Sequence, residues 1–272
     1  MEKDVILNNG VKMPILGYGV YLVNPSECTQ CVKEAIETGY RHIDTAQYYG
    51  NEKEVGEGIR LSGVPREQIF VTTKTQTYGY NSTKKGIDES LKKFGFPYFD
   101  LILIHWPTGD DIGTYKALEE AYKQGKCKAI GLSNFNEREF LEIYNKFETK
   151  PAVNQIETHL FFNQKKMHNF LAKYNCVHQS WSPLGGKGAK VLKNKTLIKV
   201  AEKYGKTPSQ ISLRYLLDLN IVVLPKSTHK NRMIENAKIF DFKLKEEDMK
   251  LLSSIDTGRG GSWPSSMREE FY

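Results

Sequence analysis

The chain alternates short apolar segments with amphipathic ones along most of its 272 residues, and no other feature restricts the fold as strongly. Such alternation is typical of strands separated by helices, and therefore of an α/β fold. Several of the segments are uninterrupted apolar runs, as expected for parallel strands buried on both faces. A β-hairpin over residues 4–13, turned at Asn9-Gly10, precedes them. The eight strand-like segments span residues 15–17, 41–44, 69–74, 100–105, 129–133, 153–156, 177–181 and 221–224.

The segments between the strands carry signals that begin and end helices. Asn24 and Thr207 each precede a proline, the arrangement of an N-cap followed by proline at the first helical position. Gly39 and Gly63 stand where a C-terminal cap belongs. No linker or low-complexity stretch divides the chain, so we expect one domain over residues 1–272. Eight strands with helices between them fit either a doubly wound open sheet or a closed (β/α)8 barrel, and periodicity alone does not choose.

The distribution of charge bears on the partners of the chain. The net charge is +7, but basic residues are scattered among Asp and Glu, and the longest basic runs, such as Lys84-Lys85, have only two residues. This distribution is typical of a solvated surface, so we expect no nucleic-acid partner. The positive field favours an anionic ligand, such as a cofactor that carries phosphate groups.

The sequence predicts a cytoplasmic protein without a membrane segment. No apolar run approaches the roughly 20 residues that span a bilayer. Strand-like residues begin at positions 5–7, which leaves no room for a signal or transit peptide. Cys28 and Cys31 form a lone C-x-x-C that we expect to be ordinary helix residues, and Cys127 and Cys176 stand far apart. Unbridged thiols fit a reducing compartment.

Residues able to donate protons, form hydrogen bonds or stack stand at the ends of seven successive strands. Each alone has an ordinary explanation, such as a helix cap for Asp44, a surface charge for Lys74 or a buried imidazole for His105. Together they favour a barrel, whose active site collects side chains from the C-terminal ends of many strands, whereas an open sheet concentrates them near one switch point. No G-x-G-x-x-G or P-loop motif is present, so a Rossmann or P-loop phosphate site is not supported. The seven positions are Asp44, Lys74, His105, Ser133-Asn134, Gln155, Trp181 and Lys226.

A series of motifs resembles the aldo-keto reductase family, in the family's order, from Gly17 to about Phe242. Each motif is modest alone, but the ordered set is specific. The resemblance implies a (β/α)8 TIM barrel, here with an N-terminal β-hairpin and a short C-terminal loop, and NADPH-dependent reduction of aldehydes or ketones. The motifs are GYRHIDTA (39–46) with YGNE (49–52), VTTK (71–74), LIHWP (103–107), GLSNF (131–135), NQIE (154–157), SPLG (182–185) and LPKS (224–227) with residues 232–236.

Carried over by position, the resemblance makes Asp44, Tyr49, Lys74 and His105 a catalytic tetrad. Hydride addition to a carbonyl leaves a developing alkoxide, which needs a proton, and a phenol with a pKa near 10 is a weak acid at neutral pH. A buried ammonium at Lys74, held by Asp44, would stabilise the phenolate and ease proton release from Tyr49. A neutral His105 would donate a hydrogen bond to the substrate oxygen. The spacing from Asp44 and the following Gly-Asn-Glu select Tyr49, and we expect its neighbour Tyr48 to be a packing residue.

The resemblance also implies the cofactor contacts. Ser133, Asn134 and Gln155 resemble the trio that bonds the nicotinamide amide, and Trp181 stands where an aromatic ring stacks on the nicotinamide, the alternative being a core tryptophan. Nearby cofactor contacts are expected from Ser182 and Leu184. The remaining expected contacts lie around the last strand and the next helix: Lys226, Ser227, Thr228 and Arg232 for the 2′-phosphate, and Glu235 and Asn236 for the adenine.

The 2′-phosphate would gain charge-assisted bonds at this helix N-terminus. Two such bonds, at about 1.5–3 kcal/mol each, would favour NADPH over NADH by roughly 10²–10⁴.

The substrate site is expected to include Tyr21, His105 and Trp106 and to take a small-molecule carbonyl compound. Several positions near it depart from the pattern common in the family. These departures concern the substrate and leave the tetrad complete. They are Thr75-Gln76, Leu160, the short loop 108–113, and the short C-terminal segment 256–272, in which Trp263 and Phe271 are candidates to roof a pocket.

Two other functions fit parts of the sequence. A metal-dependent barrel hydrolase would use His42 and Asp44, two residues apart on one strand, with His105 and His159, but H-x-H and H-E-x-x-H signals are missing and Tyr49 would have no role. We therefore expect no metal. A non-catalytic, nucleotide-bound barrel is the other alternative, and the complete tetrad argues against it. The family resemblance favours a monomer.

Overall fold

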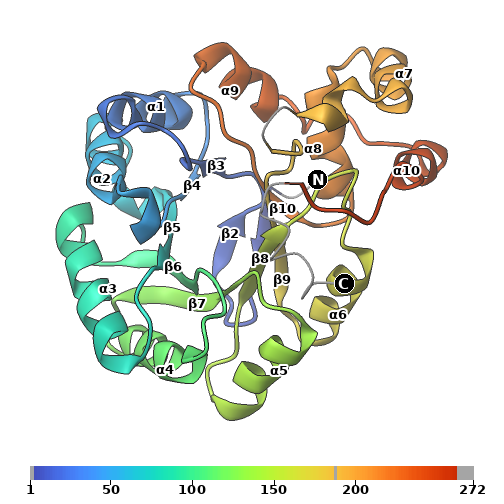
Figure 1. Cartoon of the computed structure of the whole chain (residues 1–272). Coiled ribbons are helices and arrows are strands. Elements are labelled where there is room, and N and C mark those ends of the chain that lie inside the picture. Colours follow the sequence, from blue (N-terminus) through green and yellow to red (C-terminus); the bar gives the residue numbers. More distant parts are fainter. Residues whose placement is uncertain (1–2, 187–188, 262–272) are drawn as a thin grey trace.

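A computed structural model describes residues 3–186 and 189–261, so the predicted roof residues Trp263 and Phe271 lie outside the described residues. The described chain contains eight parallel strands in one sheet, and each strand pairs with its neighbours in chain order. Figure 1 shows them arranged around a common axis inside a ring of helices. The strands are β3 (Tyr18–Gly19), β4 (His42–Asp44), β5 (Phe70–Thr75), β6 (Phe99–Ile104), β7 (Cys127–Ser133), β8 (Val153–Glu157), β9 (Val177–Trp181) and β10 (Val222–Leu224).

The sheet closes on itself between its first and last strands. Leu16 forms a parallel bridge with Val223, the Gly17 amide donates to the Val223 carbonyl at 2.9 Å, and the Val223 amide donates to the Ile15 carbonyl at 2.9 Å. Gly17 permits this approach, because a Cβ atom there would lie 2.5 Å from Leu224 Cδ2. The prediction of a closed (β/α)8 barrel is confirmed, and the open sheet is excluded. The first strand lies just after the predicted segment 15–17, which instead makes the closing seam.

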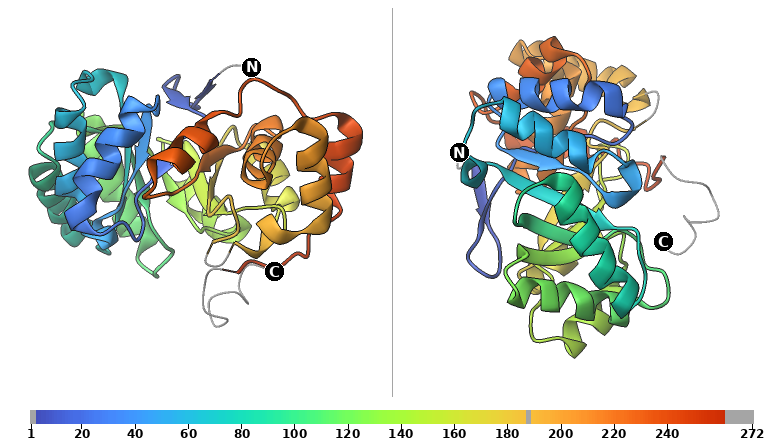
Figure 2. Two further views of the ribbon diagram at one scale, coloured as in Figure 1. Left: turned by 90° about the horizontal axis from the view of Figure 1, so that it is seen from above. Right: turned by 90° about the vertical axis from the view of Figure 1, so that its left-hand side faces the viewer.

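The N-terminal hairpin consists of β1 (Asp4–Ile6) and β2 (Lys12–Pro14), paired antiparallel with Val5 opposite Met13. Its turn contains Gly10 at φ +85°, a conformation that glycine adopts without strain. Figure 2 shows the hairpin at one end of the barrel and the last described residues near the other end. Met13 is fully buried, so the hairpin covers the N-terminal end of the strands. The hairpin prediction is confirmed.

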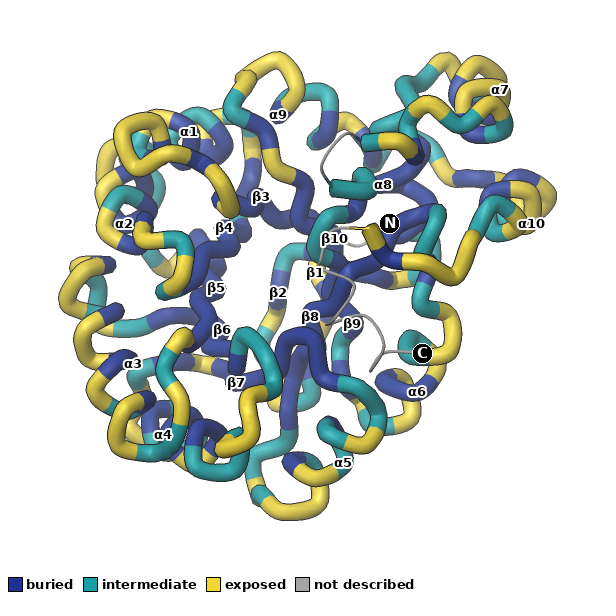
Figure 3. Tube along the Cα trace, viewed as in Figure 1, coloured by how far each residue is buried: buried dark blue, intermediate teal, exposed yellow. Residues whose placement is uncertain are grey.

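The helices cover the outside of the barrel, with exposed outer faces and buried inner faces (Figure 3). The predicted caps are present: Asn24 accepts from the Ser26 amide, and Thr207 forms a capping box with Gln210. The helices are α1 (Pro25–Glu37), α2 (Glu52–Leu61), α3 (Tyr80–Phe94), α4 (Asp111–Lys123), α5 (Glu137–Lys146), α6 (Lys165–Lys173), α7 (Lys195–Tyr204), α8 (Pro208–Asp218), α9 (Lys230–Ala237) and α10 (Glu246–Ser253), with short 3-10 turns η1 (Gln47–Tyr49), η2 (Arg66–Gln68) and η3 (Lys190–Lys193).

The cysteines are buried and unbridged, and Cys28 and Cys31 lie within α1, as predicted. Within residues 3–186 and 189–261, no helix combines the length and the apolar character needed to traverse a bilayer.

Candidate active site

The four residues predicted as a tetrad meet at the C-terminal ends of β4, β5 and β6. Asp44 ends β4, Tyr49 ends the 3-10 turn that follows it, Lys74 is the penultimate residue of β5, and His105 comes directly after β6. The Lys74 ammonium lies 2.6 Å from Asp44 Oδ1 and 3.2 Å from the Tyr49 hydroxyl. Because the carboxyl ends of parallel strands share one end of the barrel, residues from three strands converge there.

Lys74 and Asp44 form a buried ion pair, with side chains 1% and 5% exposed. The backbone carbonyl of Thr45 accepts a further hydrogen bond from the Lys74 ammonium at 2.9 Å, a contact that the sequence analysis did not anticipate. Burial lowers the pKa of Lys74, while the charge and hydrogen bond of Asp44 oppose that shift. The lysine is thus fixed by three oxygen acceptors, and the tyrosine hydroxyl is one of them.

The electrostatic surroundings of Tyr49 differ from the expectation in one respect. Burial, followed by the negative charge of Asp44 and the proximity of Tyr21, raises the pKa of Tyr49 well above its ordinary value. The neighbouring ammonium of Lys74 does not overcome this effect. The phenol is therefore held in its protonated form at neutral pH, the form that a proton donor requires before reaction.

His105 faces the Tyr49 ring, with ring centroids 5.7 Å apart and nearly perpendicular planes. Burial, and then the positive charge of Lys74, lowers the pKa of His105 to about 3. The imidazole is therefore neutral at physiological pH, the condition on which its predicted donor role depends, and carries one N–H donor and one acceptor nitrogen.

The aromatic residues at the mouth of the barrel surround this group. The Tyr21 ring lies 5.0 Å from that of Tyr49, and Tyr21 is 44% exposed. Trp106, next to His105, is partly buried. Tyr48 is 58% exposed, and its ring packs edge-on against that of His105, with the centroids 6.3 Å apart. The 3-10 turn directs Tyr48 outward while Tyr49 turns inward.

The ends of β7 and β9 form a second polar group. The Ser133 hydroxyl donates to the backbone carbonyl of Gln155 at 2.9 Å, and the side-chain amide nitrogen of Asn134 donates to the backbone carbonyl of His105 at 3.0 Å. Asn134 Oδ1 accepts from the indole N–H of Trp181 at 2.8 Å, so the half-buried Trp181 is anchored at the mouth.

The backbone at these strand ends is unusual. Asn134 (φ +65°) and Ser182 (φ +53°) are left-handed although neither is glycine, a feature that concentrates at functional sites. Leu184, two residues beyond Ser182, is partly buried against the core. The predicted cofactor residues of these strand ends are therefore neighbours.

Gln155, on β8, connects the Asp44–Lys74–Tyr49 group with the polar side chains at the ends of β7 and β9. Its amide nitrogen donates to Asp44 Oδ2 at 2.8 Å and to Gln179 Oε1 at 2.7 Å. Gln179 is fully buried on β9 and was missed by the sequence analysis. A signal for it existed, because it precedes Trp181 by two residues in a predicted strand and must share its face.

The predicted phosphate-binding residues follow β10 and enter α9. Lys226 and Arg232 are exposed, and neither takes part in an ion pair with any described residue. The N-cap position of α9, His229, provides no side-chain cap, so the amides of Lys230 and Asn231 have no capping side chain, whereas the Arg232 amide donates to the His229 carbonyl at 3.0 Å. The other members lie nearby in sequence: Ser227 and Asn236 are buried, Thr228 is partly buried, and Glu235 accepts from the Thr207 hydroxyl at 2.8 Å.

His42 and His159, two of the ligands that the metal-hydrolase alternative would need, have different hydrogen-bond partners. His42 contacts the Pro14 carbonyl and the Thr72 hydroxyl, each at 3.1 Å, whereas His159 pairs with Glu157 at 3.2 Å. Among the residues that the structure describes, no three His, Cys, Asp or Glu side chains are grouped as metal ligands.

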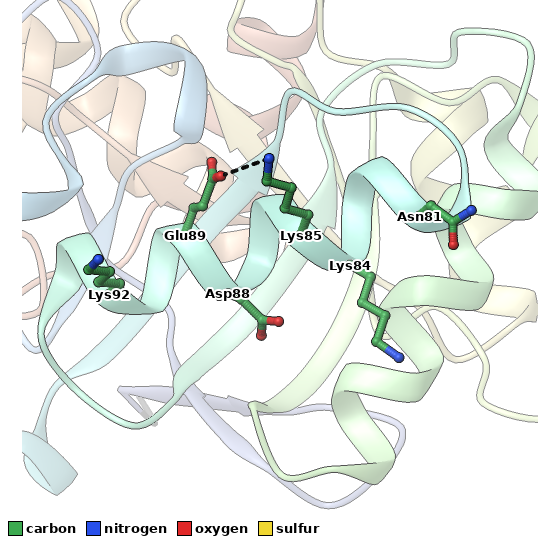
Figure 4. A pocket seen from close by; sticks show the side chains of 6 residues that line it. All are labelled: Asn81, Lys84, Lys85, Asp88, Glu89 and Lys92. Carbon is green, nitrogen blue, oxygen red and sulfur yellow. Dashed lines mark ion pairs between the residues drawn. The ribbon is translucent and has the colours of Figure 1, made fainter.

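A hollow on the outer face of α3 lies away from this site. Figure 4 shows it lined by charged side chains, with Lys85 and Glu89 paired at 3.8 Å along the helix. Lys84 pairs with Glu120, and Asp88 with Lys126. These are exposed pairs on a solvated helix and offer no chemistry.

Comparison with known proteins agrees with the geometry. The family model described as the Aldo/keto reductase family matches residues 16–257. The chain is 44% identical over 257 residues to the 9,11-endoperoxide prostaglandin H2 reductase of Trypanosoma cruzi, covering 93% of this chain and 91% of that protein. It is 43% identical to the glyoxal reductase of Bacillus subtilis, with 94% of each covered.

The fold is also similar to that of a solved aldo-keto reductase structure. The crystal structure of MGS-M4, an aldo-keto reductase enzyme from a Medee basin deep-sea metagenome library, superposes with a TM-score of 0.92 at 44% identity, covering 94% of this chain and 96% of that one. The chain therefore belongs to the aldo/keto reductase family of oxidoreductases, which act on carbonyl compounds and use nicotinamide cofactors.

Proposed function

We propose that the protein transfers a hydride from NADPH to an aldehyde or ketone, and oxidises the alcohol in the reverse direction, with Tyr49 as the general acid. The observation that carries this proposal is the contact of the Lys74 ammonium with both Asp44, at 2.6 Å, and the Tyr49 hydroxyl, at 3.2 Å. A phenol, an ammonium and a carboxylate in this order suit proton delivery to a developing alkoxide.

Each member of the tetrad has a role that follows from its surroundings. Tyr49 stays protonated until the substrate oxygen becomes basic, because burial and Asp44 raise its pKa. As the proton leaves, Lys74 stabilises the phenolate, and Asp44 keeps Lys74 charged and in place. Neutral His105 donates its N–H to the carbonyl oxygen and orients it. When bound, the reduced nicotinamide supplies the hydride.

The residues around the barrel mouth fit this cofactor. Ser133, Asn134, Gln155, Trp181, Ser182 and Leu184 would hold the nicotinamide half. Lys226, Ser227, Thr228 and Arg232 would hold the 2′-phosphate, and Glu235 and Asn236 the adenine. Support comes from the unpaired charges of Lys226 and Arg232 in the described chain beside an uncapped helix N-terminus, which suits a phosphate.

The carbonyl substrate would bind among Tyr21, His105 and Trp106, beside the Tyr49 hydroxyl. The aromatic rings at the mouth provide apolar walls, and the polar group at the bottom fixes the carbonyl.

The test is NADPH oxidation on addition of reactive aldehydes and ketones, followed as the loss of absorbance of the reduced nicotinamide. Tyr49→Phe removes only the hydroxyl and should lower kcat by about 10²–10⁴ while NADPH binding persists. Tyr80→Phe, which removes a hydroxyl at the start of α3 that donates to Glu120 of α4, is the matched control. Unchanged kcat in Tyr49→Phe would remove Tyr49 from the mechanism. Tight NADPH binding without turnover across the panel would favour the non-catalytic alternative.

We also propose the domain organisation, oligomeric state and cellular location of the protein. Residues 1–272 form one catalytic domain that acts as a cytoplasmic monomer, without a nucleic-acid partner. The interleaved surface charges support this, since Lys84, Lys126 and Lys203 each pair with acidic neighbours rather than forming a basic patch. Sedimentation equilibrium would test the monomer.

A further inference from the structure

We propose that Gln179 is a positioning residue, which fixes the amide of Gln155 so that the Gln155 carbonyl oxygen is the atom offered to the carboxamide N–H of the nicotinamide. The inference rests on the proposed function and adds to it a residue that lies below the cofactor site and touches neither cofactor nor substrate. Four contacts between buried side chains lead to it.

Gln155 and Gln179 are paired residues of adjacent strands, β8 and β9, directly opposite each other in the parallel register. Their side chains are 1% and 0% exposed. The Gln155 amide nitrogen lies 2.7 Å from Gln179 Oε1 and 2.8 Å from Asp44 Oδ2. The second Asp44 oxygen accepts from Lys74 at 2.6 Å, so the carboxylate is satisfied on both sides.

The charge of Asp44 determines which end of the Gln155 amide faces it. An ionised carboxylate only accepts hydrogen bonds, so the group beside it must be the NH2 and not the carbonyl of Gln155. One such contact fixes the end of the amide but leaves rotation about the N–H···O axis. The second contact, to Gln179 Oε1, fixes the plane of the amide.

With both N–H groups engaged, the side-chain oxygen (Oε1) of Gln155 is the end of the amide that faces neither Asp44 nor Gln179. No donor among the described residues is hydrogen-bonded to this side-chain oxygen, so its lone pairs are left for a ligand. A primary carboxamide such as that of nicotinamide provides the matching N–H donor.

The hairpin at the N-terminal end of the strands supports Gln179 from below. The Gln179 amide nitrogen lies 3.8 Å from the sulfur of Met13, which is fully buried on β2. Because a thioether is a weak acceptor, this contact orients the Gln179 side chain without competing for its carbonyl oxygen. The oxygen is therefore directed to Gln155.

The test compares two ligands that differ only at the carboxamide. Dissociation constants of NADP⁺ and of its 3-acetylpyridine analogue, in which a methyl group replaces the NH2, are measured by quenching of tryptophan fluorescence. In the unmodified protein one buried hydrogen bond should make NADP⁺ bind about tenfold more tightly than the analogue. Gln179→Met removes the acceptor at nearly constant volume, and the tenfold ratio should fall toward one.

Two further variants separate positioning from general damage. Gln179→Asn withdraws the acceptor by one methylene and should lower the ratio as methionine does, even if the methionine variant fails to fold. Gln179→Glu keeps an acceptor at the same reach and should preserve the ratio. Thr72→Val is the matched control, since it removes a buried contact with His42 in the same barrel without touching Gln155, and it should leave the ratio unchanged.

The outcomes are distinct. A wild-type ratio of one, or a ratio that stays near ten in folded Gln179→Met and Gln179→Asn, overturns the positioning role. Equal weakening of both ligands in these variants also overturns it, because it indicates only a structural role. A wild-type protein that binds NADP⁺ with the expected discrimination but reduces no carbonyl would refute the proposed function while leaving this inference standing.

Discussion

Replacing Lys74 by methionine removes the ammonium 3.2 Å from the Tyr49 hydroxyl and keeps a side chain of similar length. At that separation, with an effective dielectric constant of about 20, a full phenolate and an ammonium attract by about 5 kcal/mol. A transition state with the proton half transferred would lose about half of this. Since each 1.4 kcal/mol is about a factor of ten in rate, a loss of about 2.5 kcal/mol should lower kcat by about 10².

The same substitution should also destabilise the fold, because it leaves the buried Asp44 carboxylate with only Gln155 as a partner. Removing one member of a buried pair typically costs about 3–5 kcal/mol. Asp44→Asn in the same chain removes the uncompensated charge, so the double variant should regain much of the stability but none of the activity. Lys84→Met, which removes an exposed lysine on α3, is the control for losing a lysine.

The assay is steady-state NADPH oxidation together with urea unfolding followed by circular dichroism. Activity and stability are thereby measured on the same preparations. If Lys74→Met remains folded and its kcat lies within threefold of the wild type, the electrostatic role assigned to Lys74 is refuted.

Two further predictions concern pH and cofactor preference. Burial lowers the pKa of His178 to about 3, so the folded protein keeps this imidazole neutral while the unfolded chain takes up a proton near pH 6.5. The stability that the neutral imidazole provides is complete above about pH 6.5 and falls as the pH drops toward 3, so the urea midpoint should decrease from pH 7 to pH 5. His178→Gln should weaken that decrease, and an equally steep decrease in this variant would contradict the assignment. Lys226→Ala and Arg232→Ala should each raise the KM for NADPH by roughly 10- to 100-fold and leave that for NADH unchanged. Equal increases for both cofactors would argue against a 2′-phosphate site.

The alternation of strands and helices predicted an α/β fold, and the polar and aromatic residues at seven successive strand ends favoured the closed barrel over an open sheet. The predicted position of the first strand differs from the observed one: residues 15–17 were predicted, whereas β3 spans Tyr18–Gly19. That shift depends on how Gly17 fits against Leu224, which is more than 200 positions away in the chain and invisible to local periodicity.

The convergence of Asp44, Lys74 and His105 was predictable because strand ends meet at one end of a barrel, whereas Tyr49 was chosen from the resemblance to the aldo-keto reductases. The pKa of Tyr49 was not predictable, since its direction depends on how strongly burial outweighs the nearby ammonium. The outward direction of Tyr48 follows from the 3-10 turn, which the sequence analysis had not foreseen. The Gln155–Gln179 pair required the register of β8 against β9, which is a tertiary property.

The seam between Leu16 and Val223 has a consequence for synthesis on the ribosome. The two sides of this seam come from opposite ends of the barrel sequence, so the cylinder stays open until β10 has been translated and has left the exit tunnel. Until then the first and last strands of the growing sheet present unpaired edges, which are prone to associate with other chains. A nascent-chain series released at increasing lengths should therefore change from protease-sensitive to protease-resistant only after the Val222–Leu224 segment emerges.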